Sequence, residues 1–217
     1  MWSASEIVTP NAPAGLRPLA RALLAAAVAL AIAGCSSPPA PYPDQIAAWH
    51  AEKDRFMRES PDSPVPADKR AAFPPLPYFP IDAAYRVPAA LQSVPSGSSL
   101  EMLTSTGQRR LMRRVGRLAF TVNGQPLTLG AFVEADQQDL RRLFVPFGDL
   151  TNGVETYNAG RYLELERTAT GFYDLDFNRA FHPFCLFNSS YDCPYPPPEN
   201  RLKLPIRAGE KLSAPKR

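Results

Sequence analysis

The amino-acid sequence predicts an all-β fold: an antiparallel sandwich or partly closed barrel of about eight strands, with a short N-terminal helix and long irregular C-terminal loops. The prediction rests on three features of the chain. From residue 81 onward, apolar and polar residues alternate with the period of a strand. The candidate strands are short and closely spaced, with no helical pattern between them. Asn123-Gly124 is typical of a type I′ turn joining two such strands.

Residues 1–34 have the pattern of a secretory signal peptide. Two positive charges, Arg17 and Arg21, precede an apolar run from Ala22 to Ile32, and small residues then lead to Cys35 in the form of a bacterial lipobox. The apolar run is too short to cross a bilayer, whose hydrocarbon core is about 30 Å thick. We therefore expect export, cleavage before Cys35 and lipidation of its thiol.

The predicted anchor also indicates where the protein functions. Residue 36 is Ser and not the Asp that retains lipoproteins in the inner membrane, so we expect a lipid-anchored cell-envelope protein, in the outer membrane facing the periplasm. The membrane is thus one partner, through Cys35, and a small ligand or an envelope protein is the other. A net charge of +3 is too small to favour nucleic acid. Residues 35–43 comprise the lipidated cysteine and a proline-rich tether.

Residues 44–80 are expected to form a helix followed by an extended segment. Asp44 can cap a helix that runs to about Arg58. Prolines recur from residue 60 to residue 80, which leaves room for at most one helical turn, over residues 67–73. One helix face carries a stripe of residues at spacings of three and four: Ile46, Trp49, Lys53, Phe56 and Met57.

Residues 81–217 are expected to form a single β domain. The sequence Ser-Gly-Ser-Ser at residues 96–99 favours a turn between the first two strands. The predicted strands are residues 85–91, 99–105, 110–122, 127–133, 140–147, 162–167, 172–177 and 202–207.

Once Cys35 is assigned to the lipid, two cysteines remain, Cys185 and Cys193. In an oxidising envelope such a pair is expected to close a disulfide loop. The alternative is half of a metal site, but the chain has only two histidines and no second cysteine pair to complete it. We therefore predict no metal and no cofactor.

Two long segments are richer in polar and aromatic residues than a β scaffold requires: FGDLTNGVETYNAGRYLELE at residues 147–166, and DLDFNRAFHPFCLFNSSYDCPYPPPENRLKLPIRAGEK at residues 174–211. In this order they resemble the bacterial family catalogued as domain of unknown function 1684. The resemblance implies a fold and no particular activity. The chain departs from the family pattern at Phe181 and His182, where the family has Tyr and Asn. That departure argues against His182 as a general base.

Polar residues near the predicted strand ends and in the loops are the candidate ligand-binding groups. Arg161 could bind a carboxylate or phosphate through two hydrogen bonds. Alternatively, Arg161 pairs with an aspartate to join loop and sheet, while asparagines satisfy the backbone. The candidates are Asp149, Tyr157, Arg161, Asp176, Asn178, Glu199 and Asn200.

A further candidate feature is the aromatic C-terminal half of the chain. Its side chains could line a groove for a sugar or an apolar ligand, or else form the core and a lid pinned by the cysteine pair. The residues concerned are Tyr157, Tyr162, Tyr173, Phe177, Phe181, Phe184, Phe187, Tyr191 and Tyr195.

The leading functional hypothesis is a non-catalytic, lipid-anchored β domain that binds a ligand or an envelope partner. The chain lacks a nucleophile-elbow motif, a zinc-protease motif and a glycine-rich phosphate loop. Catalytic residues therefore remain unknown, and whether the protein is an enzyme stays open. The alternative is an envelope hydrolase, acting on glycan with two of the carboxylates Asp149, Asp176 and Glu199.

Overall fold

The computed structural model describes residues 38–213, apart from the side chains of residues 95–97, and it contains one antiparallel sheet of six strands in this range. The predicted signal peptide and Cys35 lie outside the described residues. In the part that the structure describes, no helix combines the length and apolar character needed to span a membrane. The strands are β1 (Arg86–Leu103), β2 (Arg109–Val122), β3 (Gln125–Glu134), β4 (Arg142–Phe147), β5 (Arg161–Glu166) and β6 (Tyr173–Asp176).

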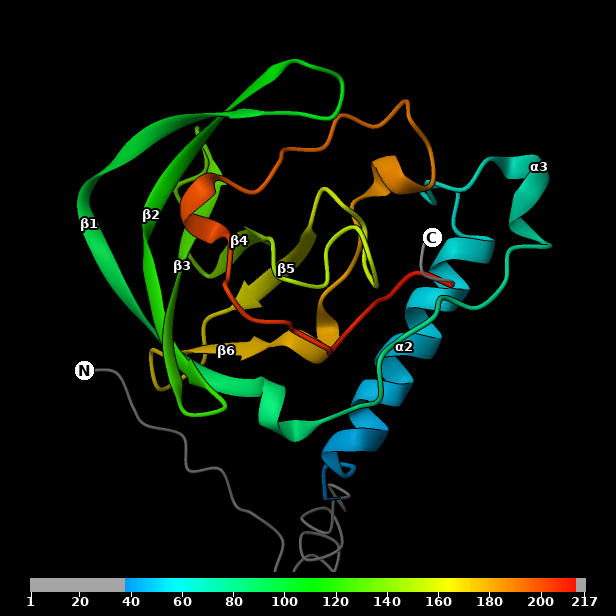
Figure 1. The fold of residues 1–217 in the computed structure, drawn as a ribbon, viewed down its shortest axis with the longest axis horizontal. Helices are drawn as coiled ribbons and strands as arrows, with labels where there is room; N and C mark the ends of the chain where they lie inside the picture. The colour runs from blue at the N-terminus through cyan, green and yellow to red at the C-terminus, as the bar shows by residue number, and fades with distance from the viewer. Residues whose placement is uncertain (1–37, 214–217) are drawn as a thin grey trace, which may run out of the picture. The chain divides into compact units, whose positions relative to one another are not determined.

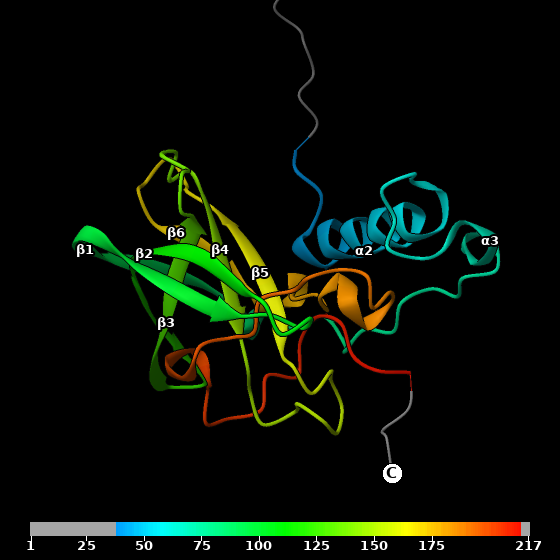
Figure 2. The same cartoon turned by 90° about the horizontal axis from the view of Figure 1, so that it is seen from above.

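The sheet curls until its two edges almost meet (Figures 1 and 2). Strands β1 to β5 follow one another as neighbours, and β6 returns to pair with the start of β1, which gives the order β5-β4-β3-β2-β1-β6. An isolated bridge between Arg167 and Tyr173 then connects the end of β5 to β6. The sheet is therefore nearly closed, which confirms an all-β fold and selects the partly closed barrel over the sandwich.

Two of the predicted strands, residues 85–91 and 99–105, are a single continuous strand, β1. Its register against β2 jumps from Ser93 opposite Gly116 to Ser98 opposite Arg114, so four residues of β1 oppose one residue of β2. Pro95 lies within this bulge, where its missing N–H breaks no ladder bond. The turn predicted at residues 96–99 is thus wrong, because β2 pairs with β1 on both sides of the bulge.

The hairpin between β2 and β3 is confirmed. Asn123 has φ 49° and Gly124 has φ 75°, the two positive values that a type I′ turn needs. The barrel interior is apolar because alternate side chains of each strand point inward. On β5, for example, Leu163 and Leu165 are buried while Glu164 is exposed.

The N-terminal helix α2 (Tyr42–Glu59) begins two residues before the predicted cap. Pro41 occupies the cap position without a side-chain hydrogen bond, and Asp44 lies in the first turn instead. The predicted inward face is confirmed, since Ile46 and Met57 are fully buried. In both views the helix runs beside the barrel rather than as part of it (Figures 1 and 2).

The proline-rich segment after α2 is extended, as predicted, with one short helix, α3 (Ala67–Arg70). It adds a second, smaller core in which Met57 of α2 packs with Val65 and Leu76. The segment thereby fastens α2 through apolar contacts.

The strand predicted over residues 202–207 is wrong, because this segment is irregular. Its backbone groups bond to the chain just after β4 and to side chains rather than to another strand. The N–H of Leu202 donates to the carbonyl of Gly148, and the carbonyl of Leu204 accepts from the N–H of Leu150. The N–H of Ile206 donates to Oδ1 of Asp149 at 3.2 Å, and the carbonyl of Ile206 accepts from Arg161. Pro205 also removes one backbone donor. The apolar alternation that suggested a strand reflects burial of Leu202, Leu204 and Ile206.

Candidate functional site

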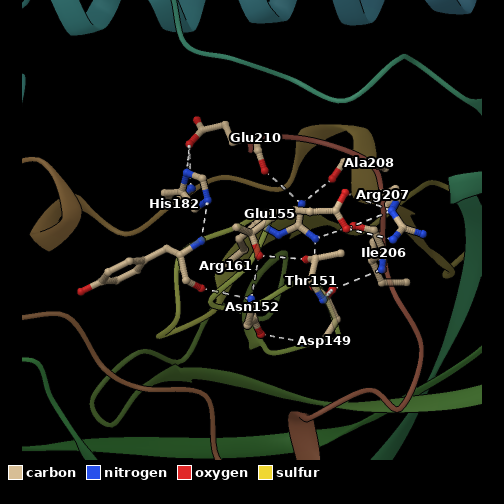
Figure 3. A network of polar contacts seen from close by, with 12 residues as sticks. Asp149, Thr151, Asn152, Glu155, Arg161, His182, Ile206, Arg207, Ala208 and Glu210 are labelled. Atoms are coloured by element: carbon tan, nitrogen blue, oxygen red, sulfur yellow. Dashed lines mark hydrogen bonds and ion pairs between the residues drawn. The ribbon is translucent and has the colours of Figure 1, made fainter. Parts of the chain in front are cut away.

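Arg161 is completely buried and occupies the first position of β5, in phase with the inward-facing Leu163 and Leu165. Its Nη2 donates to Oδ2 of Asp149 at 2.9 Å and to the carbonyl of Ile206. Its Nη1 donates to the carbonyls of residues 208 and 210 (Figure 3). Four hydrogen bonds within the chain thus occupy both terminal nitrogens of the guanidinium, while Nε has no partner among the described residues. Arg161 and Asp149 therefore form a structural ion pair and not the predicted ligand clamp.

His182 and Glu210 form a second buried pair beside this network (Figure 3). The backbone N–H of His182 donates to Oε2 of Glu210 at 2.8 Å, and Nδ1 of the ring lies 3.3 Å from the same oxygen. Nε2 accepts from the backbone N–H of Tyr157 at 3.3 Å. Because Nε2 acts as an acceptor, this network assigns the ring proton to Nδ1. His182 therefore holds Glu210 in place, in line with the expectation that it is no general base.

Asp176 and Asn178 connect the end of β6 to the first turn of α2. Oδ1 of Asp176 accepts from the hydroxyl of Tyr42 at 2.9 Å and from the N–H of Asn178 at 3.0 Å. Nδ2 of Asn178 donates to the Tyr42 hydroxyl and to the carbonyl of Asp82, both at 2.8 Å. Asp176 and Asn178 are both buried, so these predicted ligand groups fasten the helix to the barrel.

The side chain of Asn200 replaces backbone hydrogen bonds that are missing between β3 and β4. Strands β3 and β4 share only the pair Phe132 and Phe144, since Pro146 has no N–H to donate. The Asn200 side chain fills the gap: it accepts from the N–H of Gly130 and donates to the carbonyls of Gly130 and Pro146. It is fully buried.

The neighbouring Glu199 is partly exposed and pairs with Arg114 of β2. The three carboxylates of the hydrolase alternative, Asp149, Asp176 and Glu199, therefore belong to three separate networks. Two of them are buried and committed to bonds within the chain. Across residues 38–213, no three His, Cys, Asp or Glu side chains come together as a metal site. The structure thus favours the structural reading for Asp149, Arg161, Asp176, Asn178 and Asn200, and it offers no shared carboxylate cleft.

Cys185 and Cys193 lie side by side as thiols, with the backbone N–H of Cys185 donating to Sγ of Cys193 at 3.2 Å. The predicted disulfide is therefore not formed in this structure, although the two residues are placed to make one. A hydrogen bond from Cys193 lowers the pKa of Cys185, and the Ser105 and Tyr157 side chains act in the same direction. The last predicted ligand residue, Tyr157, is thus a neighbour of this thiol pair.

A groove that could hold a ligand lies on the outer face of the sheet. We define the lid segment as residues 181–195; it crosses outside β3, β4 and β5 and leaves a hollow of about 420 Å³, which we name the lid groove. Aromatic side chains form its walls, and four of them belong to the set of nine predicted for an aromatic groove; Tyr173 and Phe177 of that set lie in the barrel core instead. The aromatic wall residues are Phe132, Phe144, Tyr162, Phe181, Phe184 and Tyr191.

Two arginines, Arg110 and Arg142, line the lid groove together with the carboxylates Glu134, Glu164 and Asp192. Nε of Arg110 is 3.9 Å from Glu134, which is beyond hydrogen-bond distance. Arg142 pairs across strands with Glu166 at 3.1 Å. Neither arginine was among the sequence candidates, and nor was Phe144. One signal was available in the sequence. Phe144 lies between the inward-facing Leu143 and Val145, so it occupies an outward-facing position where a polar residue is expected.

We predict that Arg161→Met strongly destabilises the protein. The substitution leaves Asp149 as an unpaired buried charge, and loss of one partner of a buried pair costs about 3–5 kcal/mol. The matched control is Arg207→Met, because Arg207 pairs with Glu155 at the surface and such pairs contribute less than about 1 kcal/mol. Urea denaturation measures both. Equal stability of Arg161→Met and the wild type would contradict the structural role.

We also predict that the cysteine pair oxidises when the protein is exported. Protein made in a bacterial periplasm and unfolded without reductant is expected to show no titratable thiol at Cys185 or Cys193. After reduction and refolding, the lowered pKa of Cys185 makes it the first of the two to react with iodoacetamide at pH 7, because the thiolate is the nucleophile. Two free thiols in the exported protein would rule out the disulfide.

Comparison with a solved structure supports this fold. The solution NMR structure of the uncharacterized protein from gene locus rrnAC0354 of Haloarcula marismortui is 38% identical in sequence, with a TM-score of 0.61. The similarity covers 78% of this chain and 93% of that chain. No curated protein matches the chain at a significant level.

The family resemblance seen in the sequence is confirmed over most of the β domain and the segment before it. A family model described as "Protein of unknown function (DUF1684)" matches residues 71–211. This range includes all six strands, the lid segment and the Arg161 network. The chain therefore belongs to the DUF1684 family of proteins of unknown function.

Proposed function

We propose that this protein is a non-catalytic ligand-binding module of the cell envelope whose ligand occupies the lid groove. The observation that supports it most directly is the aromatic wall of the groove, formed by outward-facing side chains of β3, β4 and β5. Ligand sites are concave hollows of about 300–1,000 Å³ with mostly apolar walls and a few polar groups. The lid groove, at about 420 Å³, falls within this range.

The groove walls favour a ligand with a flat apolar body and an acidic group. Phe144 and Tyr162 meet edge to face, with ring centroids 4.8 Å apart, and Phe181 continues the aromatic surface beyond Tyr162. Arg110 is the cation that we assign to the acidic group, since its 3.9 Å ion pair with Glu134 is longer than a hydrogen bond, and a ligand would compete there with Glu134 and Asp192. A guanidinium prefers carboxylate or phosphate oxygens, which supply two acceptors in matching geometry.

The location in the envelope follows from the predicted lipobox at Cys35 and belongs to the same proposal. Helix α2 begins at Tyr42, seven residues after the predicted lipid site Cys35 in the sequence. A proline-rich tether of this length keeps the domain close to the membrane, since it spans only about 3.1 Å per residue when extended. The ligand is then a molecule of the envelope, or a segment of an envelope protein with the same chemistry.

The probe for this proposal is 8-anilinonaphthalene-1-sulfonate, an aromatic anion that fluoresces when it leaves water. We expect residues 36–217 to bind it at one saturable site. Arg110→Ala should weaken binding about fivefold or more, because a charge-assisted hydrogen bond contributes about 1.5–3 kcal/mol before solvent screening. Fluorescence titration measures the change.

The matched control for the probe is Arg117→Ala, which removes another β2 arginine that is exposed and lies outside the groove lining. Circular dichroism must show that both variants remain folded, since partly unfolded proteins also bind this dye. Equal weakening in the two variants would mean that the dye senses general surface charge. Unchanged binding in Arg110→Ala would place the ligand elsewhere.

Membrane attachment is tested by substitution of the predicted lipid site. We expect the full-length protein to remain in the membrane fraction after a high-salt wash, because acyl chains resist salt whereas electrostatic contacts do not. Cys35→Ser should release it. Cell fractionation followed by immunoblotting measures the distribution, with Cys193→Ser as the control for loss of a cysteine. Retention of Cys35→Ser in washed membranes would contradict lipid anchoring.

A further inference from the structure

A second hollow adjoins the lid groove and contains an unusual lysine. We name it the helix groove: it has a volume of about 700 Å³ and lies between α2 and the ends of β5 and β6. Lys53 of α2 lines it, with its side chain only 15% exposed. The two hollows share four lining residues, Arg142, Glu164, Phe181 and Phe184.

The amine of Lys53 has an apolar environment on one side. Nζ lies 4.2 Å from the ring centroid of Phe181 and 5.8 Å from that of Phe184. On the other side it lies 3.9 Å from Oε1 of Glu210, too far for a hydrogen bond. Oε1 itself is buried and has no hydrogen-bond partner among the described residues. An ammonium group here loses the water that would stabilise its charge.

The protonation of Lys53 reflects these surroundings. Burial lowers the pKa of the amine, and the charges of Glu210 and Glu164 oppose that shift without reversing it. An exposed lysine has a pKa near 10.4, so at pH 7 only about one in 2,500 is neutral and nucleophilic. The fraction of Lys53 that is neutral at pH 7 is larger.

A second unsatisfied group lies near the same carboxylate. The hydroxyl of Tyr78 is also buried without a hydrogen-bond partner among the described residues. Burial raises its pKa, and the charge of Glu210 acts in the same direction. Buried polar atoms are nearly always paired, so two orphaned oxygens on the bridged residues Tyr78 and Glu210 are unusual. They are typical of a site that is completed when a polar molecule enters it.

We propose that Lys53 is a nucleophilic amine that captures a small aldehyde or 2-oxo acid as an imine in the helix groove. The nitrogen attacks the carbonyl carbon, and the carbonyl oxygen becomes a hydroxyl by taking up a proton. Loss of that hydroxyl as water, with loss of the nitrogen proton, leaves a C=N bond. One amine and one carbonyl thus give one imine and one water, with no oxidation or reduction.

Glu210 is positioned to move the protons in this step. His182 holds Oε2 of Glu210, which leaves Oε1 facing Nζ at 3.9 Å, a gap that a small side-chain movement closes. A desolvated lysine next to an acid–base group is the arrangement that activates amines for imine formation. Arg167 also lines the groove, and we assign it to a carboxylate on the carbonyl compound, because Arg142 is already paired with Glu166. That carboxylate would compete with the acidic residues of the same lining, Glu164, Glu166, Asp174 and Asp176. Imine formation at Lys53 does not require a ligand in the lid groove.

The test uses glyoxylate as the carbonyl and sodium cyanoborohydride to reduce the imine to a stable amine. Residues 36–217 are incubated with both at pH 7, and peptide mass spectrometry follows the modification of each lysine. We expect Lys53 to be modified faster than Lys69 and Lys203, since a lowered pKa raises the fraction of the amine that is neutral at pH 7. Equal or slower modification of Lys53 would overturn the proposal.

Substitutions show whether the adduct belongs to this site. Lys53→Arg keeps a cation next to Glu210 but has no nucleophilic amine, so the rapid modification seen in the wild type should disappear. The matched control, Lys203→Arg at an exposed position, should keep the rapid modification of Lys53. The comparison of lysines within the wild-type protein decides the question even if Lys53→Arg does not fold. The two proposals can fail separately. If the dye does not bind in the lid groove but Lys53 is still labelled, the proposed function is refuted and the imine proposal stands.

Discussion

The buried guanidinium of Arg161 is the constraint on which the C-terminal half of the structure depends. A charge inside an apolar barrel is stable only if it is paired and hydrogen-bonded. Asp149 supplies the opposite charge, and the carbonyls of Ile206, Ala208 and Glu210 supply the remaining acceptors. These carbonyls have no strand to bond to, so the guanidinium also satisfies a segment that a sheet would otherwise have to pair. One side chain thereby joins β5, the loop after β4 and the C-terminal segment.

The candidate reactive site depends on the same network through a short chain of contacts. Arg161 fixes the backbone of Glu210, and His182 fixes one oxygen of its carboxylate. The other oxygen is left facing Lys53, across the interface between the barrel and α2. Asp176 and Asn178 hold the first turn of that helix against β6, so both partners of the Lys53–Glu210 contact are anchored by buried polar residues. Most of the predicted site residues act as supports that place other groups.

Local patterns predicted most of the fold, but not the grooves. Alternation located the strands, and Asn123-Gly124 located the hairpin, because both depend on neighbours in the sequence. The role of Asn200 depends on Gly130 and Pro146, which are 70 and 54 positions away. Arg161 carried a usable signal, since it shares the phase of Leu163 and Leu165 and is therefore inward-facing. No comparable signal linked Arg110, Phe144 and Phe181, whose shared groove exists only because the lid segment crosses the sheet.

Phe181 and His182, which are neighbours in the lid segment, both contact the Lys53 cluster. Tyrosine at residue 181 would add a hydroxyl to a wall that Phe181 keeps apolar next to the amine. Asparagine at residue 182 keeps the backbone N–H that donates to Glu210 but has no imidazole to approach the same oxygen. The apolar environment of Lys53 therefore depends on Phe181, and a Phe181→Tyr substitution would leave the amine better solvated and less nucleophilic.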